Sequence, residues 1–297
     1  MAVKIYNPLT KKIEVEDVCQ EAFLRFLYGN FFGKFLLWAL FKRAIFSRAI
    51  GVWANMGISK SAARKFAKNH NIRIADFKKS PEEFKSFNDF FTREIRPETR
   101  PVSEGENDIS FPADARNLAI ENIQNRDVFF AKGQRFNLAE FLGGKELAAR
   151  FEGGSMLISR LCPLDYHRFH YPVSGRIAAR REIGGFLYSV NPIALSKSIN
   201  YLCQNKRVLT IIELESGKMC AIVEIGATNV GSIVNFDKVG GEIRRGELMG
   251  MFKFGGSCIV SIFEKGTAKF SQELIDLSSE PIEYLSTANS KAGELLQ

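Results

Sequence analysis

Two histidines set close together are the residues of this sequence best suited to acid–base chemistry. His167 and His170 lie three positions apart in the segment Asp165–Pro172, and the whole chain contains only three histidines. A histidine is the usual general base near neutral pH, so the pair predicts proton transfer. An HxxH pair can also bind a metal, but no HExxH sequence or cysteine cluster lies nearby to complete a ligand set. We therefore expect no metal. On spacing alone, acid–base chemistry stays one interpretation; the other is that one histidine is a hydrogen-bonded structural residue and the other is exposed.

A serine preceded by two glycines is the second feature that could do chemistry. Ser257 follows Gly255 and Gly256 between two segments that read as strands. A hairpin turn is the simplest interpretation, and the same tripeptide recurs at Gly153–Ser155, so it proves nothing by itself. The alternative is a reactive serine, because glycines permit unusual backbone angles and leave the preceding carbonyl unshielded. Asp114, in the segment FPADARN, is either an ordinary turn aspartate or a carboxylate that orients a histidine.

The composition limits the class of protein. The chain has 297 residues, of which 45% are hydrophobic and 25% are charged. This is the composition of a globular protein with one or two domains. Five scattered cysteines form no CxxC pair, which favours reduced thiols over a disulfide framework or a zinc site. The polar N-terminus shows no secretory signal, so we expect a cytosolic setting.

A basic, aromatic segment spans residues 22–66. Its lysines and arginines number eight, it has no aspartate or glutamate, and it holds both tryptophans, Trp38 and Trp53. It therefore accounts for the whole net charge of +8. Its charge-free runs are too short to cross a bilayer, but cations with aromatic rings suit an anionic membrane surface. One alternative is a helical layer packed on the protein's own core. Nucleic-acid binding is a second, less favoured alternative, because so much bulky aliphatic surface suits phosphates poorly.

The first part of the chain reads as helical. Within residues 22–66, helix breaks are expected near Gly29 and Gly33, because glycine weakens a helix. A later helix is expected to begin at Ser80, with Glu83 completing a capping box. These signals predict several short helices rather than one long one.

The rest of the chain turns to β-structure. Two prolines in RPETRP mark a boundary near residue 100. Residues 208–225 predict a hairpin around a Glu-Ser-Gly-Lys turn, and other segments are rich in β-branched and aromatic residues. We therefore expect an α+β fold: a helical, membrane-associating layer over residues 1–100, followed by a β-rich catalytic domain over residues 101–297.

Several motifs occur in a characteristic order between residues 88 and 263. They are NDFFTREIRPETRP, FPADARN, KGQRFNLAEFLGG, CPLDYHRFHYPVSG, LYSVNP, EIGATNVGSI and RGELMGMFKFGGSCIVSIF. In this order they resemble the motifs of the phosphatidylserine decarboxylase proenzyme family. Each motif is weak by itself, but DYHRxHxP, the GAT-xVGSI segment and the late FxxGGS are specific in combination. The resemblance covers about two-thirds of the chain.

The resemblance implies that the chain makes its own cofactor. Ser257 would attack the carbonyl carbon of Gly256 and convert the peptide bond into an ester. His170 would accept the serine proton, and Asp114 would orient that histidine, as in a catalytic triad. Elimination from the ester and hydrolysis would then leave a pyruvoyl group at residue 257 and release ammonia.

The resemblance also implies the reaction and the partners. The pieces 1–256 and 257–297 would stay together, as one unit of a homodimer. The pyruvoyl ketone would form a Schiff base with the serine amine of phosphatidylserine and accept electrons as carbon dioxide leaves, giving phosphatidylethanolamine. His167 would act in this decarboxylation step. The protein would be a peripheral membrane protein on the cytoplasmic face of the cell membrane, with no nucleic-acid partner.

Two positions depart from the family pattern, and two other functions stay open. Ala115 replaces a glycine, and Cys258 stands where family members usually carry serine or threonine. Neither change removes a required functional group. One alternative is a hydrolase that uses Asp114, His170 and Ser257 without cutting itself. The other is a non-catalytic protein that binds membranes. Cleavage of the chain distinguishes the decarboxylase from both.

Overall fold

The computed structural model describes residues 3–18, 21–70, 72–123, 136–228, 232–255, 257–280 and 282–296. The strands are β1 (Lys4–Asn7), β2 (Lys12–Val15), β3 (Asp108–Ser110), β4 (Ala115–Ile120), β5 (Ser155–Leu161), β6 (Arg168–His170), β7 (Gly175–Ile183), β8 (Arg207–Glu213), β9 (Met219–Gly226), β10 (Ile233–Asn235), β11 (Glu242–Ile243), β12 (Leu248–Phe252), β13 (Ser257–Phe263), β14 (Ala268–Phe270), β15 (Glu283–Ser286) and β16 (Lys291–Leu295). The helices are α1 (Glu21–Gly29), α2 (Phe31–Leu36), α3 (Ala44–Asn55), α4 (Lys60–Asn69), α5 (Phe87–Phe91), α6 (Leu138–Leu142), α7 (Lys145–Arg150), α8 (Pro192–Leu195), α9 (Tyr201–Gln204) and α10 (Gln272–Ser279), with a π-helical turn at Leu37–Phe41.

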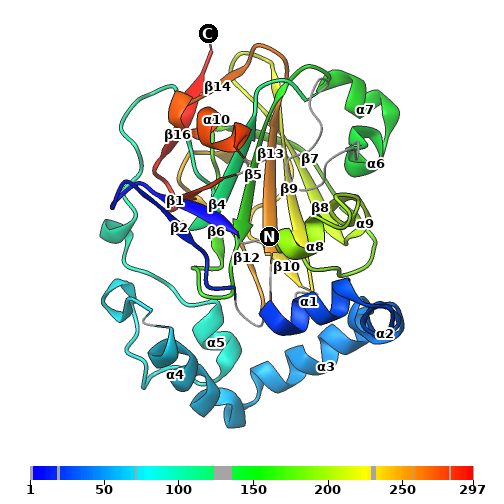
Figure 1. Cartoon of the computed structure of the whole chain (residues 1–297). Helices are drawn as coiled ribbons and strands as arrows, with labels where there is room; N and C mark the ends of the chain where they lie inside the picture. The colour runs from blue at the N-terminus through cyan, green and yellow to red at the C-terminus, as the bar shows by residue number, and fades with distance from the viewer. Residues whose placement is uncertain are drawn as a thin grey trace.

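A ten-stranded sheet forms the body of the molecule. Its strand order is β11-β7-β8-β9-β13-β5-β4-β15-β1-β2, and the only parallel pair among the described strands is β1 with β15. Two smaller sheets, β10-β12-β6 and β14-β16-β3, complete the β-structure. Figure 1 shows the N-terminal helices α1 to α5 along one end of this body. The mixed α and β architecture agrees with the predicted fold class, although β1 and β2 place part of the first 100 residues in the large sheet.

The hairpin predicted within residues 208–225 is confirmed. Strands β8 and β9 pair in register from Arg207 opposite Ile225 to Glu213 opposite Met219. The turn between them needs Gly217, whose φ of +76° is a left-handed angle that glycine adopts without strain. Strand β13, inserted between β9 and β5, then places Ser257 at the start of a central strand.

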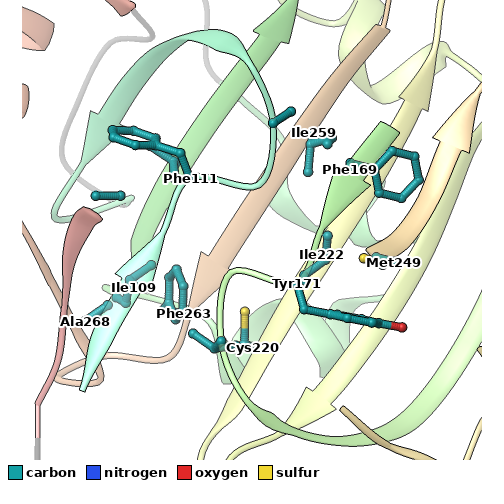
Figure 2. Packing of buried hydrophobic residues seen from close by; sticks show 14 of the residues in the cluster. Ile109, Phe111, Phe169, Tyr171, Cys220, Ile222, Met249, Ile259, Phe263 and Ala268 are labelled. Carbon is teal, nitrogen blue, oxygen red and sulfur yellow. The ribbon is translucent and has the colours of Figure 1, made fainter. Parts of the chain in front are cut away.

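Each face of β13 packs against its own hydrophobic core, because successive side chains alternate between faces. Ile259 and Phe263 face the core shared with the sheet β10-β12-β6, where they join Phe169 and Met249 (Figure 2). Val260, on the other face, belongs to the core covered by helices α6 to α9. The strand that begins at Ser257 is therefore anchored on both sides.

The helix breaks in the N-terminal segment agree only in part with the two that its glycines predict. The break falls at Gly29, where Asn30 caps α2 by accepting a hydrogen bond from the Gly33 N–H (2.7 Å). Gly33 lies inside α2 and does not break it. A Cβ at this position would come within 2.0 Å of the Phe26 carbonyl oxygen, so glycine allows α1 and α2 to approach.

The helix expected from Ser80 does not form. The predicted capping contact is present, since the Ser80 N–H donates to Glu83 Oε2 (2.6 Å), but it closes only a turn. The helix begins later, at Phe87, after Ser86, whose hydroxyl accepts from the Asp89 N–H (3.1 Å). The predicted contact between Ser80 and Glu83 therefore forms, but too few residues separate it from α5 for a helix of their own.

Candidate active site

Ser257 combines complete burial with an unused hydroxyl. Its side chain has no exposed surface, and Oγ makes no hydrogen bond with any described residue. An unpaired buried hydroxyl costs free energy, so its retention points to chemistry or to a bound water. The preceding Gly255 has a φ of +135°, a conformation that only glycine adopts readily. Gly256, the other residue of the predicted cleavage bond, lies outside the described residues.

Helix α5 holds the segment that leads to Ser257. The N–H of Phe254 donates to Asn88 Oδ1 (3.1 Å), and the Phe254 ring packs edge-on against Phe87 and Phe91 at centroid distances of 4.9 and 5.2 Å. The motif NDFF therefore fixes the approach of the chain to the reactive serine.

His167 is a buried, neutral imidazole beside this segment. It has no exposed surface, and its ring lies 3.8 Å, centroid to centroid, from that of Phe91. Nδ1 lies 3.0 Å from the carbonyl oxygen of Asp165. A carbonyl only accepts, so Nδ1 carries the proton and Nε2 has a free lone pair. Nε2 makes no hydrogen bond with the described residues.

Burial lowers the pKa of His167 to about 3. The carbonyl of Asp165 opposes this effect, the cations of Arg93 and Arg116 add to it, and the Gly255 backbone raises the pKa slightly. The interaction with Gly255 places the ring beside the residue before Gly256, one position ahead of the predicted cleavage bond. At neutral pH the ring is therefore an uncharged base that packs, through Phe91, next to the segment leading to Ser257.

His170 and Asp114 lie near each other but are each engaged elsewhere. His170 Nδ1 donates to the Gly246 carbonyl (2.9 Å), and its Nε2 faces the Tyr166 hydroxyl (3.4 Å). Burial lowers the pKa of His170, and the Asp114 carboxylate acts against this lowering. Asp114 itself is held by Arg100.

Arg100 is a partner of Asp114 that the sequence interpretation missed. Its Nε and Nη2 donate to the two carboxylate oxygens of Asp114 at 2.8 and 2.6 Å, and the N–H of Ala288 also donates to Oδ1 (2.8 Å). No hydrogen bond between described residues joins Asp114 to His170, or His170 to Ser257. The triad of Asp114, His170 and Ser257 therefore stays a prediction.

Two cavities border these residues. The larger, about 720 Å³, reaches Gly255 and is lined by apolar side chains of α1 and α3, including Leu24 and Trp53, together with Lys65 of α4. The smaller, about 530 Å³, contains His170 with the cations of Arg100 and Arg168. Among the described residues, no group of three histidine, cysteine, aspartate or glutamate side chains is arranged to hold a metal ion.

The family model described as Phosphatidylserine decarboxylase matches residues 87–293. The chain belongs to this family. A phosphatidylserine decarboxylase proenzyme of Fusobacterium nucleatum is 40% identical over 274 residues, which cover 92% of this chain and 91% of that protein. The proenzyme of Ruminiclostridium cellulolyticum is 38% identical over 294 residues, covering 99% and 98%.

Family membership confirms the resemblance seen in the ordered motifs. The chain is thereby an enzyme of the lyase class, a decarboxylase of the phosphatidylserine decarboxylase family. The match also extends across the basic N-terminal segment, since the Ruminiclostridium relative aligns over nearly the full length of both chains.

Proposed function

We propose that this protein converts phosphatidylserine to phosphatidylethanolamine and carbon dioxide after cutting its own chain between Gly256 and Ser257. The observation that carries the proposal is the buried Ser257 hydroxyl, which lacks a described partner and follows a glycine with a φ of +135°. In a family of proenzymes, such a hydroxyl is the nucleophile that self-cleavage needs. The pyruvoyl group made from Ser257 supplies the electron sink for loss of carbon dioxide.

Different residues of the chain act in self-cleavage and in the later decarboxylation. Ser257 Oγ attacks the carbonyl carbon of Gly256 and loses its proton to a base, for which His170, oriented by Asp114, follows from the family motif. His167 acts in the later turnover, where its lone pair at Nε2 receives or returns a proton beside residue 257. Arg100 keeps Asp114 in place through its two hydrogen bonds.

The two pieces stay together because the cleavage falls at a strand end. β13 pairs with β9 and with β5 along its whole length, from Ser257 to Phe263. Cleavage before residue 257 would therefore leave the smaller piece held by β13 in the middle of the large sheet. A homodimer of this unit remains a prediction of the family resemblance.

The larger cavity suits a lipid substrate. It runs from apolar side chains of the N-terminal helices to Gly255 at the reactive segment. Acyl chains would lie against Leu24 and Trp53, and Lys65 offers a positive charge to the phosphate of the headgroup. The serine amine would then meet residue 257.

An exposed aromatic surface on α2 and the π-helical turn after it supports contact with an anionic bilayer. Phe31 is 90% exposed, and Phe32, Phe35 and Trp38 are also exposed on α2 and the π-helical turn after it. Lys34 is exposed among them. No described helix is long and apolar enough to span a bilayer. We propose that this surface rests on the cytoplasmic face of the cell membrane, with the rings at headgroup depth.

Replacing Phe31 and Trp38 together with serine is expected to weaken binding to vesicles of anionic lipid by at least about tenfold, because two rings leave the interface. Vesicle sedimentation measures the bound fraction. Leu9→Ser is the control, since Leu9 is 85% exposed on the turn between β1 and β2. Equal binding by the double variant and the control would show that this surface does not contact lipid.

The intact mass of the purified protein tests the proposed function. We expect two pieces under denaturing conditions, ending at Gly256 and beginning at residue 257, with the smaller piece lighter by one ammonia than a peptide that starts with serine. The protein should also release carbon dioxide from phosphatidylserine. A single uncut chain of 33.4 kDa would instead support a hydrolase or a non-catalytic lipid-binding protein.

A further inference from the structure

Glu224 of β9 is a buried carboxyl group that the mechanism above does not use. Its side chain has no exposed surface, and neither carboxyl oxygen makes a hydrogen bond with a described residue. A buried carboxyl group without partners is costly, and such groups gather where chemistry needs them. The position of Glu224 relative to Ser257 indicates which reaction step such a group could serve.

The strand register places Glu224 on the same side of the sheet as Ser257. Ser257 lies opposite Gly226, and Ile259 lies opposite Glu224, with no irregularity between the two pairs. Residues two apart on a strand share a face, so Ser257 and Glu224 are diagonal neighbours. Such neighbours have Cβ atoms about 7–8 Å apart, within the reach of a long side chain. Gly226 has no side chain, so nothing from β9 stands between them.

The surroundings keep the Glu224 carboxyl group in its acid form. Burial raises its pKa to about 8, and the positive charge of Arg180, with the polar side chains of Asn235 and Thr210, only partly opposes this. The guanidinium of Arg180 is already engaged: Nε donates to the Thr210 hydroxyl (3.0 Å), and Nη1 donates to the Asp237 carbonyl. At neutral pH Glu224 is therefore mostly a neutral carboxylic acid with a proton to give.

Self-cleavage has a step that a neighbouring acid can assist. After the acyl shift, the Gly256 acyl group is bound to Ser257 Oγ as an ester. A base removes the proton from Ser257 Cα, the Cβ–Oγ bond breaks, and its electron pair leaves with Oγ as the new carboxylate of Gly256. Negative charge thus develops at Oγ, on the face of the sheet that carries Glu224.

We propose that Glu224 is the acid of this elimination, donating its proton to the departing carboxylate of Gly256. The proton removed from Ser257 Cα by the base balances the one that Glu224 gives up, and exchange through water restores Glu224. This inference rests on the proposed self-cleavage and assigns a residue to its second step.

The test follows maturation of Glu224→Gln by intact mass and by hydroxylamine. Glutamine keeps the size and the hydrogen-bonding capacity but cannot give up a proton, so maturation should slow by about 10²-fold or more. The ester should then persist, and hydroxylamine should split it into a chain 1–256 ending in a hydroxamate and a chain 257–297 starting with serine. The sequence has no Asn-Gly bond, the peptide that hydroxylamine otherwise attacks.

Three variants complete the design. Glu224→Asp keeps the acid and should mature faster than Glu224→Gln. Glu213→Gln, the same change at the partly exposed end of β8, should mature like the wild type. Adding Ser257→Ala to Glu224→Gln should abolish the cut by hydroxylamine, because no ester can form.

The outcomes separate this inference from the proposed function. Wild-type protein that never cleaves contradicts the proposed function itself. If the wild type cleaves and Glu224→Gln matures equally fast, only the role of Glu224 is wrong. A Glu224→Gln chain that stays intact and resists hydroxylamine is blocked before the ester or is misfolded, and this result also overturns the assignment to elimination.

Discussion

Ser257→Ala is expected to yield a single chain of 33.4 kDa with no decarboxylase activity. Alanine lacks the Oγ atom that attacks the Gly256 carbonyl, so neither the ester nor the pyruvoyl group can form. The side chain is fully buried and its hydroxyl has no described partner, so the substitution removes no hydrogen bond between described residues. Intact mass reports the cleavage, and release of carbon dioxide from phosphatidylserine reports the activity.

Ser155→Ala is the matched control within the same chain. Ser155 also follows two glycines, and it pairs with Phe263 at the far end of β13. Its hydroxyl donates to the carbonyl oxygens of Ala268 and Glu121 (3.3 and 3.4 Å). These bonds tie the serine to the fold and assign it no chemistry. We expect this variant to cleave and decarboxylate like the wild type. A Ser257→Ala protein that still splits at the same bond would disprove the role of the hydroxyl.

Arg160→Met is expected to lower the free energy of unfolding by about 3–5 kcal/mol. Arg160 is 3% exposed and lies opposite Cys258, the residue after the reactive serine. Its guanidinium bonds to both carboxylate oxygens of Glu283 and to Glu16 Oε2 (2.7 Å). Methionine would leave two buried carboxylates without their shared cation. The free energy lost by removing one member of a buried ion group is larger than the net stabilisation that the whole group provides.

This network joins distant parts of the chain at the site. Glu16 Oε1 also forms an ion pair with Nε of Arg116 (2.7 Å), and Arg116 pairs with Asp165 in the loop that carries His167. Burial tends to raise the pKa of Glu16, but Arg160 and Arg116 outweigh it and lower the pKa. One set of charges thus joins the N-terminal segment, the strands β4, β5 and β15, and the loop that carries His167.

Urea unfolding measures the loss in the Ser257→Ala background, where the chain stays in one piece and unfolding is not complicated by a second chain. Lys78→Met serves as the control. Lys78 pairs with Glu94 (3.0 Å), and both side chains are 48% exposed, so this change should cost less than about 1 kcal/mol. If the two variants lose equal stability, the buried network does not hold the site together.

The sequence by itself determined the family and the local elements. The motifs identified the enzyme class and singled out Ser257 and the histidine pair, and local patterns predicted the hairpin of β8 and β9 and the strand β13. These features follow from neighbouring residues: alternation suits a strand, and Gly217 suits its turn. The same local reasoning failed at Ser80, where a capping contact formed without a helix.

Only the tertiary structure decided which side chains meet around the reactive serine. Asn88 reaches Phe254 across 166 positions, and Arg160 reaches Glu16 across 144. Glu224 shares a face with Ser257 because β13 inserts between β9 and β5 in one register, and a shift of one residue would turn it away. Burial by that packing also holds His167 and Glu224 uncharged. Strand order, register and desolvation depend on contacts between distant segments, which no local pattern specifies.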